Sequence, residues 1–456
     1  MNGLRCAPYN GNKTHVLPQS EVAAVASKSP HQMIVTRRHI KMSEVLQKAK
    51  LAKAASIQMN RVSTADKNEA LLRMADHLIT SQLSIIQANQ LDLDNGRKNG
   101  TSSSLLDRLA LNEKRVAEIA EGLRQIAQLT DPVGTLLQTI DRPNGIRIEQ
   151  LRVPLGVIGM IYEARPNVTV DAAGLCLKTG NAVVLRGGSA ALHTNKRIVE
   201  VLHEALESSA LPKDAVQLIE DADRKSVDEM LKLNGWLDVV IPRGGASLIQ
   251  NVVQNATVPV IETGAGICHT YIDQGANPEM ATAIALNAKV QRPSVCNAME
   301  TLLIHQDYDQ AAVTELLKAF HDAQVELRGC ERTLQLAPYA KQATEQDYAT
   351  EYNDYILNIR FVSNLDEALA HISRYGTKHS ECIVTERSSE AERFLQEVDA
   401  AAVYHNASTR FTDGFEFGFG AEIGISTQKL HARGPMGLVA LTSTKYRVTG
   451  QGQIRS

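Results

Sequence analysis

The chain has 456 residues, 43% of them apolar, and a formal net charge of −3. This length predicts about two or three domains with substantial apolar cores. The near-neutral charge and an aromatic content of only 4% argue against a general nucleic-acid-binding surface. No apolar run reaches the roughly 18 residues of a membrane span, so we expect no membrane association.

The first 41 residues differ from the rest. They show no sustained apolar period, and they lack the apolar core of a secretory signal. We interpret 1–41 as a disordered extension, or as an upstream start that is not part of the native protein. An organellar presequence is the alternative, and Glu21 and the absence of an Arg-rich amphipathic helix argue against it.

Residues 42–127 show a helical pattern, which is clearest in the apolar stripe that begins at Val116 and follows the N-cap candidate Asn112. The pattern then changes to short extended runs around Asn144-Gly145, a dipeptide typical of hairpin turns. We therefore predict a β-ribbon over 133–152. The segment that starts at Leu438 also has β character, and it would pair with this ribbon or with a neighbouring subunit.

From residue 154 onward, apolar strands alternate with helices, which is the pattern of parallel sheets covered on both faces. The expected strands lie near 157–161, 182–185, 216–219, 239–241 and 258–261, then near 269–273, 300–304, 355–362, 381–385 and 401–405. The expected helices between the first five strands cover about 168–178, 193–207, 224–233 and 246–254. Two α/β domains joined near residue 264 are predicted.

Two strand-to-helix loops carry paired glycines. One is Arg186-Gly187-Gly188-Ser189, and the other contains Gly244-Gly245. Glycines let the backbone approach a ligand closely, and helix N-termini favour anions. An arginine at the end of the second strand suits a 2′-phosphate, so Arg186 favours NADP(H) over NAD(H). Each loop alone would be only a tight turn, but two in one sheet favour a phosphate-bearing cofactor.

The six cysteines are scattered, without C-x-x-C spacing, so neither a zinc site nor a thioredoxin-type motif is indicated. A reduced, cytoplasmic setting is the simpler interpretation. Cys296 is the cysteine that stands out, because it lies among small and polar residues in "QRPSVCNA", with Arg292 near in sequence to favour its thiolate.

Three longer stretches resemble known proteins: "YEARPNVTVDAAGLCLKTGNAVVLRGGSAA", "QRPSVCNAMETLL" and "ALAHISRYGTKHSECIVT". They resemble the aldehyde dehydrogenase superfamily and, within it, the γ-glutamyl phosphate reductase family of proline biosynthesis, from residue 42 almost to the C-terminus. The resemblance implies an aldehyde dehydrogenase-like α/β fold and NADPH-dependent reduction of L-glutamyl 5-phosphate to L-glutamate 5-semialdehyde with release of phosphate.

The resemblance also implies roles for individual residues. Cys296 is the expected nucleophile, which forms a thioester with the acyl group. Asn167 or Arg165 is expected to reach the oxyanion, and Arg165 and Arg292 are the candidates for binding the substrate's anionic groups. Glu422 resembles the ligand of the nicotinamide ribose.

Three further residues have open roles. Glu262 matches the general-base glutamate of hydrolytic aldehyde dehydrogenases, but a reductase of acyl phosphates needs no water-activating base. We therefore expect Glu262 to be turned away from the thioester or to be held by the Thr263-Gly264 turn. His371 and His379 lie in the third stretch, where a proton-transfer role and a hydrogen-bonded structural role both stay open.

These patterns together predict a scheme of domains and partners. The scheme assigns 42–132 and 153–264 to the NADP-binding domain, 265–434 to the catalytic domain, and 133–152 with 435–456 to an oligomerisation ribbon. We expect a homo-oligomer that acts on a small molecule, and an association with the glutamate 5-kinase of the pathway stays open. A hydrolytic aldehyde dehydrogenase is the alternative enzyme. A non-catalytic protein on the same scaffold would be expected to have lost Cys296 or the glycine loops.

Overall fold

The computed structural model describes residues 42–163 and 165–455. The prediction for 1–41 therefore lies outside the described residues. The chain then runs through five helices, as the helical pattern predicts: α1 (Glu44–Met59), α2 (Thr64–Thr80), α3 (Gln82–Lys98), α4 (Ser103–Leu109) and α5 (Glu113–Gln128).

The ends of these helices follow from their sequence. Ser43 caps α1, and Ser63 forms a reciprocal capping box with Asp66 at the start of α2. Asn112 caps α5 by accepting a hydrogen bond from the backbone of Arg115, as predicted. The predicted stripe of α5 is largely buried against α2 and α6, so these helices form one face of the first core.

The first sheet is parallel, with the order β5-β4-β3-β6. Its strands are β3 (Val157–Tyr162), β4 (Ala182–Gly187), β5 (Val216–Leu218) and β6 (Val239–Arg243). The helices along it are α6 (Pro166–Lys178), α7 (Leu192–Glu207), α8 (Arg224–Met230) and α9 (Ala246–Asn255). Every residue of β3 and β4 is buried, which explains the continuous apolar runs in the sequence.

Two predictions for this region are wrong in detail. The segment around 258–261 is not a strand, because only Val260 forms an isolated bridge, to Val240 on β6. Pro259 has no N–H to contribute to a longer ladder. The helix predicted over 224–233 ends at Met230, and a turn then leads to Gly235, whose φ of +83° is easily adopted by glycine.

The second sheet is also parallel, with the order β10-β9-β11-β8-β7-β12-β13. Its strands are β7 (Cys268–Ile272), β8 (Met299–His305), β9 (Glu326–Gly329), β10 (Lys341–Gln342), β11 (Ile356–Val362), β12 (Ser380–Val384) and β13 (Ala402–His405). The helices of this half are α10 (Pro278–Val290), α11 (Gln310–Asp322), α12 (Glu331–Leu336), α13 (Glu345–Tyr348), α14 (Leu365–Tyr375) and α15 (Ser388–Glu397).

Alternate residues of these strands are buried in two different cores. Ile272 and Leu302 belong to the cluster that contains the apolar faces of α10 and α11. Tyr271 and Leu303, one residue away on the same strands, pack with α14 and α15. Because successive side chains of a strand point to opposite faces, helices must cover both faces of this sheet.

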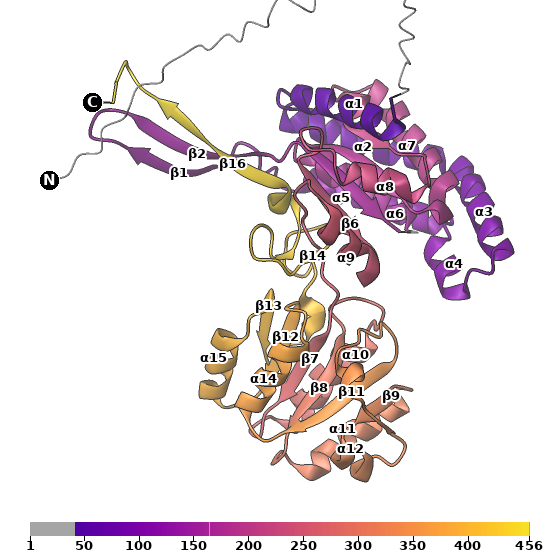
Figure 1. Ribbon diagram of the computed structural model, residues 1–456, viewed down its shortest axis with the longest axis vertical. Coiled ribbons are helices and arrows are strands. Elements are labelled where there is room, and N and C mark those ends of the chain that lie inside the picture. Colours follow the sequence, from indigo (N-terminus) through magenta and orange to yellow (C-terminus); the bar gives the residue numbers. More distant parts are fainter. Residues whose placement is uncertain (1–41, 164, 456) are drawn as a thin grey trace, which may run out of the picture. The chain divides into compact units, whose positions relative to one another are not determined.

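The remaining strands form the predicted ribbon. β1 (Leu136–Asp141), β2 (Arg147–Pro154) and β16 (Thr442–Thr449) make an antiparallel sheet with β2 in the middle (Figure 1). The hairpin at Asn144-Gly145 is confirmed, with Gly145 at φ +86°. Of the two pairings left open for the C-terminal segment, β16 pairs with the ribbon of its own chain. Two short strands, β14 (Ile425–Ser426) and β15 (Gly434–Pro435), pair with each other.

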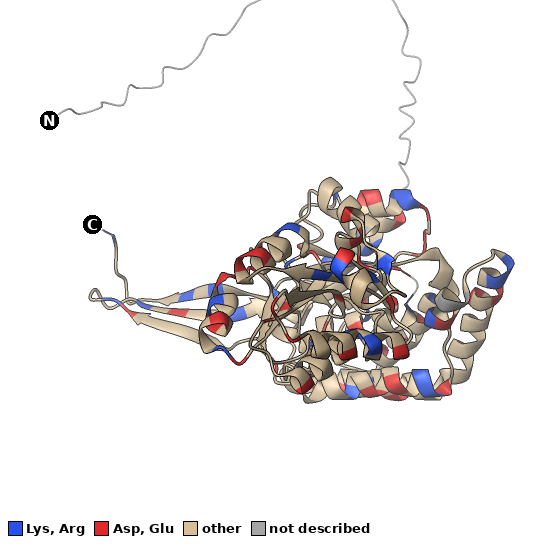
Figure 2. Ribbon diagram, turned by 90° about the horizontal axis from the view of Figure 1, so that it is seen from below, with Lys and Arg blue, Asp and Glu red and all other residues tan. Residues whose placement is uncertain are grey.

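Charged residues of both signs are interspersed along the helices (Figure 2). This agrees with the small net charge of −3. Among the helices of the described residues, none is both long enough and apolar enough to cross a membrane.

Candidate active site

A cleft of about 770 Å³ contains Cys296. Residues that follow β3 and β6 of the first sheet line one part of it, among them Glu163, Arg165 and Gly244. Residues that precede β7, β8 and β11 of the second sheet line the other part, among them Gly264, Cys296 and Glu351. The cleft therefore lies where the carboxyl ends of one parallel sheet meet the amino ends of the other.

The strand order explains why the cleft forms at this place. The chain proceeds from β3 to β4 and β5 on one side, and then returns to place β6 on the other side of β3. The loops after β3 and β6 therefore diverge, and the crevice between them is the usual ligand site of an open α/β sheet.

Cys296 is half-buried in the turn before β8, and close contacts hold its backbone in place. Its carbonyl oxygen accepts a hydrogen bond from the Cys268 thiol at 3.2 Å. Gly266 lies so close that a Cβ there would come within 1.4 Å of the same oxygen. The neighbouring Asn297 donates to the Thr412 carbonyl at 2.8 Å, and its own carbonyl accepts from Thr409 at 2.7 Å. The loop that carries Cys296 is therefore held rigidly from both sides.

The electrostatic surroundings of Cys296 are mixed. Burial raises the pKa of its thiol to about 11, the positive charge of Arg243 lowers it, and the negative charges of Glu351 and Glu422 raise it further. Arg243, rather than the expected Arg292, is thus the cation whose charge most favours the thiolate, although Arg292 also lines the cleft. Sequence reasoning missed the role of Arg243, even though it stands directly before Gly244-Gly245 at the end of β6.

The two oxyanion candidates lie in the same cleft but are bound differently. The amide nitrogen of Asn167 donates to the Asp171 carboxylate at 3.1 Å. Burial raises the pKa of Asp171 to about 6, although the hydrogen bond from Asn167 and the charge of Arg243 both lower it. The pKa of Arg165 is lowered mainly by desolvation and, to a smaller extent, by the positive charges of Arg243 and Arg108. This cluster of cations suits an anionic group.

The expected nicotinamide-ribose ligand, Glu422, also lines the cleft. Its Oε2 is buried without a hydrogen-bond partner among the described residues. The pKa of Glu422 is raised to about 7, mainly by burial and to a smaller extent by the negative charge of Asp413. An unpartnered buried acceptor of this kind fits the hydroxyl groups of a ribose.

The two glycine loops differ in their surroundings. Gly244 and Gly245 line the cleft, and the backbone N–H of Gly245 donates to the Glu163 carboxylate at 3.2 Å. A carboxylate of the chain itself therefore lies at the N-terminus of α9, the kind of position that favours anions. The other loop lies elsewhere: Gly187 ends β4, Gly188 and Ser189 follow it, and none of the three belongs to the lining of this cleft.

Arg186 is buried at the end of β4. Its guanidinium donates to the carbonyl oxygens of Ala222 at 2.8 Å, Asp223 at 3.2 Å and Gly187 at 3.1 Å, and its Nε donates to Ser226 at 3.3 Å. These bonds tie β4 to the start of α8. A 2′-phosphate would have to replace some of these acceptors, and the role of Arg186 stays a prediction.

Three other residues considered from the sequence do not line the cleft. Glu262 precedes the lining residues 263–265, and its backbone N–H donates to the Gln428 side chain at 3.0 Å. His379 is buried and its Nδ1 lies 2.9 Å from the Ser380 hydroxyl. His371 is buried among His269, Tyr348 and Tyr375. Neither histidine therefore lines the cleft, and the choice between a proton-transfer role and a structural role stays a prediction.

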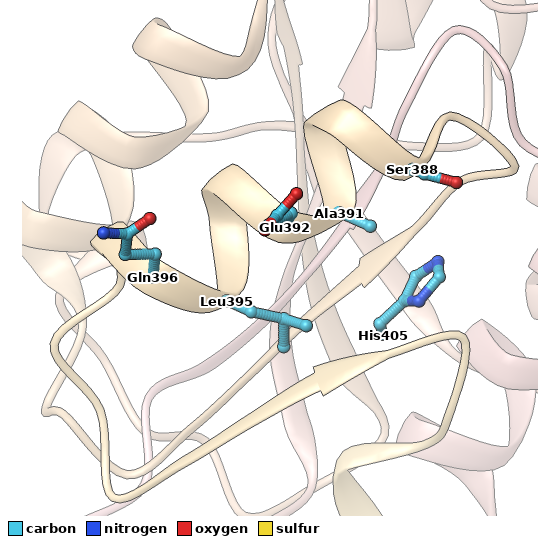
Figure 3. Close-up of a pocket in the computed structure, with 6 residues that line it drawn as sticks. All are labelled: Ser388, Ala391, Glu392, Leu395, Gln396 and His405. Atoms are coloured by element: carbon cyan, nitrogen blue, oxygen red, sulfur yellow. The ribbon is translucent and has the colours of Figure 1, made fainter.

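A second hollow lies between α15 and β13 (Figure 3). Its lining comprises Ser388, Ala391, Glu392, Leu395, Gln396 and His405. It offers one serine and one histidine and no cluster of cations or glycines. The cleft around Cys296 is therefore the candidate active site.

Comparison with known proteins identifies the family of the chain. The aldehyde dehydrogenase family model matches residues 15–358. The γ-glutamyl phosphate reductase of Halalkalibacterium halodurans is 58% identical over 415 residues, which is 91% of this chain and 100% of that protein. The crystal structure of the Thermotoga maritima γ-glutamyl phosphate reductase covers 91% of this chain and 100% of its own, with 48% identity and a TM-score of 0.89.

A more distant structure, an engineered glycolyl-CoA reductase with bound NADP+, shares the fold with a TM-score of 0.64 at 16% identity, over 89% of this chain and 96% of its own. The family model also begins at residue 15, earlier than the start at 42 that the sequence motifs indicate. The matched residues and the full-length identities establish that this chain is an oxidoreductase of the aldehyde dehydrogenase family and belongs to its γ-glutamyl phosphate reductases.

Proposed function

We propose that the protein reduces L-glutamyl 5-phosphate to L-glutamate 5-semialdehyde with NADPH and releases phosphate, through a thioester on Cys296. The observation that carries this proposal is the position of Cys296 in a cleft lined by six arginines: Arg108, Arg115, Arg165, Arg243, Arg292 and Arg410. A substrate with a carboxylate and an acyl phosphate needs such cations, because charge-assisted hydrogen bonds bind anions most strongly.

Cys296 acts first. Its thiolate attacks the acyl carbon and expels phosphate, which leaves a thioester. Arg243 favours the thiolate, and it is one of the charges that must overcome the effect of burial on the thiol. The rigid loop contacts of Cys268 and Gly266 keep the sulfur and the Cys296 amide in a fixed geometry.

The oxyanion that develops on the acyl group needs a donor. Asn167 has a second amide hydrogen beyond the one it gives to Asp171, so it can donate to the oxyanion without losing that contact. Arg165 and Arg292 would bind the substrate's anionic groups. Both line the cleft, and Arg165 belongs to the cationic cluster with Arg108 and Arg243, which supports this assignment.

The residues present fit a nicotinamide cofactor. When bound, NADPH supplies a hydride to the carbonyl carbon of the thioester. The unpartnered carboxylate oxygen of Glu422 would hold the nicotinamide ribose, and Gly244-Gly245 would face the phosphates once Glu163 gives up its contact with Gly245. Gly187, Gly188, Ser189 and Arg186 would contribute at the end of β4 where the adenosine part is expected.

The proposal is tested by NADP+ reduction with L-glutamate 5-semialdehyde, with and without phosphate. We expect activity that depends on phosphate, and its loss in Cys296→Ser with retained fold, because an alkoxide is far less available than a thiolate near neutral pH. Near-normal turnover in Cys296→Ser, or activity that is independent of phosphate, would refute the proposal. The second result would favour a hydrolytic aldehyde dehydrogenase.

The expected domain scheme and homo-oligomer belong to this proposal. β1 and β16 are the edge strands of the ribbon, and they carry the exposed apolar side chains of Leu136, Leu137, Tyr446 and Val448. Exposed apolar edges of this kind support an oligomerisation element at 133–152 and 435–456. The five described cysteines are free thiols, which supports a reducing compartment such as the cytoplasm.

A further inference from the structure

We infer that Glu351 recognises the α-ammonium group of the substrate and so selects an amino acid over an acid that lacks the amine. This inference rests on the proposed function, because it names the residue that would read the substrate's positive charge. The arginines of the cleft account for the anionic groups of the substrate, but none of them can bind a cation.

Glu351 lies in the cleft beside the nucleophile. Its Oε1 accepts a hydrogen bond from the Gly266 backbone N–H at 2.7 Å, and Gly266 packs directly against the Cys296 carbonyl. The described residues provide no hydrogen-bond partner for Oε2. The carboxylate is half-buried and lines the cleft, so this oxygen is available to a ligand.

The segment that carries Glu351 is fixed by a hydrogen bond to a buried ion pair. Two residues further on, the backbone N–H of Asn353 donates to Glu300 at 3.1 Å. Glu300 in turn pairs with Lys289 at 2.7 Å, and both side chains are completely buried. Asn353 adopts φ +55°, a left-handed conformation that a non-glycine residue keeps only where contacts stabilise it. A binding group fixed in this way loses little entropy when the ligand arrives.

The charge of Glu351 has an unfavourable effect on the free enzyme. Glu351 and Glu422 both disfavour the thiolate of Cys296. Glu422 has a separate role at the expected ribose position, whereas Glu351 lies on the side of the second sheet with Arg292 and Arg410. An ammonium group bound to Glu351 would offset its charge and thereby ease ionisation of Cys296 when the correct substrate is present.

The chemistry of the substrate gives the same residue a second purpose. A neutral α-amine can attack the activated C5 carbonyl, form a five-membered lactam and expel the thiolate or phosphate, which ends the reaction without reduction. A carboxylate next to the amine favours its protonated form, and an ammonium nitrogen has no lone pair for this attack. Glu351 would therefore keep the acyl group available for hydride.

The test compares two aldehydes in the oxidative direction, with NADP+ and phosphate. They are L-glutamate 5-semialdehyde and 5-oxopentanoate, which keeps the chain and the carboxylate but lacks the amine. In Glu351→Gln we expect kcat/KM for the semialdehyde to fall about ten- to a hundredfold, the usual effect of losing a charged hydrogen bond. The value for 5-oxopentanoate should stay within about threefold, because the glutamine oxygen can still accept from Gly266.

Two further variants make the result specific. Glu345→Gln removes a carboxylate six residues earlier that pairs with Arg374 outside the cleft, and it should leave the ratio of the two kcat/KM values unchanged. Glu351→Asp should restore part of the preference. An equal loss on both substrates in Glu351→Gln would mean that the residue only supports the Gly266 loop, and would overturn the inference while leaving the proposed function intact. A wild-type protein without phosphate-dependent activity would refute the proposed function itself.

Discussion

The thiol of Cys296 should be slow to react in the free enzyme. Burial raises its pKa to about 11. At pH 8 such a thiol is about 0.1% thiolate, whereas a cysteine with the ordinary pKa near 8.5 is about a quarter thiolate, a difference of roughly 240-fold. A thiolate of higher pKa is intrinsically more nucleophilic, and over the pKa difference between about 8.5 and about 11 this increases the rate constant of the thiolate about 13-fold. Alkylation of Cys296 by iodoacetamide should therefore be about 20-fold slower than that of an ordinary exposed thiol.

The measurement needs site resolution, because other cysteines will react. Peptide mapping by mass spectrometry after timed alkylation separates Cys296 from Cys330, which is half-buried. Burial opposes the thiolate of Cys330, but nearby backbone N–H groups hold its pKa below the ordinary value. We expect Cys330 to be modified first at pH 8, and the Cys296 rate to rise nearly tenfold for each pH unit from about 7.5 to about 9.5, well below its pKa.

Two variants should move the Cys296 rate in opposite directions. Arg243→Met removes a charge that lowers the pKa and should slow alkylation at a fixed pH, whereas Glu351→Gln removes a charge that raises the pKa and should accelerate it. A Cys296 rate that equals the Cys330 rate at pH 8 and does not rise with pH would refute the reasoning from burial. Shifts of the same sign in both variants would refute the assignment of the two charges.

Three other changes test the remaining assignments. If Arg186 binds a 2′-phosphate, Arg186→Ala should raise KM for NADPH about ten- to a hundredfold more than KM for NADH. Equal effects on both cofactors, together with a lower melting temperature, would mean that Arg186 has only a structural role through its bonds with Ala222 and Asp223. A chain that begins at Met42 should keep its melting temperature and activity, since Ser43–Ser456 groups into one unit; a large fall in either would show that 1–41 contributes. Glu262→Gln should keep phosphate-dependent activity within about tenfold, because losses of a general base usually start near a hundredfold; glutamate release by the wild type in phosphate-free buffer that stops in this variant would contradict the reductase assignment.

Local patterns in the sequence were sufficient for most of the fold. The continuous apolar runs of β3 and β4 predicted buried parallel strands, Asn144-Gly145 predicted the hairpin, and Asn112 predicted a helix start. Each of these is decided by a few neighbouring residues through burial, turn geometry or capping. The nucleophile candidate Cys296 came from the family resemblance that its motif carries, because a lone cysteine among small and polar residues is by itself more often a buried apolar residue. The strand predicted at 258–261 was wrong because pairing depends on a partner strand, and Pro259 removes a donor from the ladder.

The charges around Cys296 depended on tertiary structure. Arg243 and Glu351 are 53 residues before and 55 residues after Cys296, and only the order of strands in two separate sheets brings them together. In the same way, tertiary packing placed Glu163 on Gly245 and gave Arg186 its backbone acceptors. Periodicity and turn chemistry describe what a segment does with its neighbours in sequence. Which side chains meet across a cleft depends on how the sheets are ordered and packed, since electrostatic interactions act over a few ångströms in space regardless of separation along the chain.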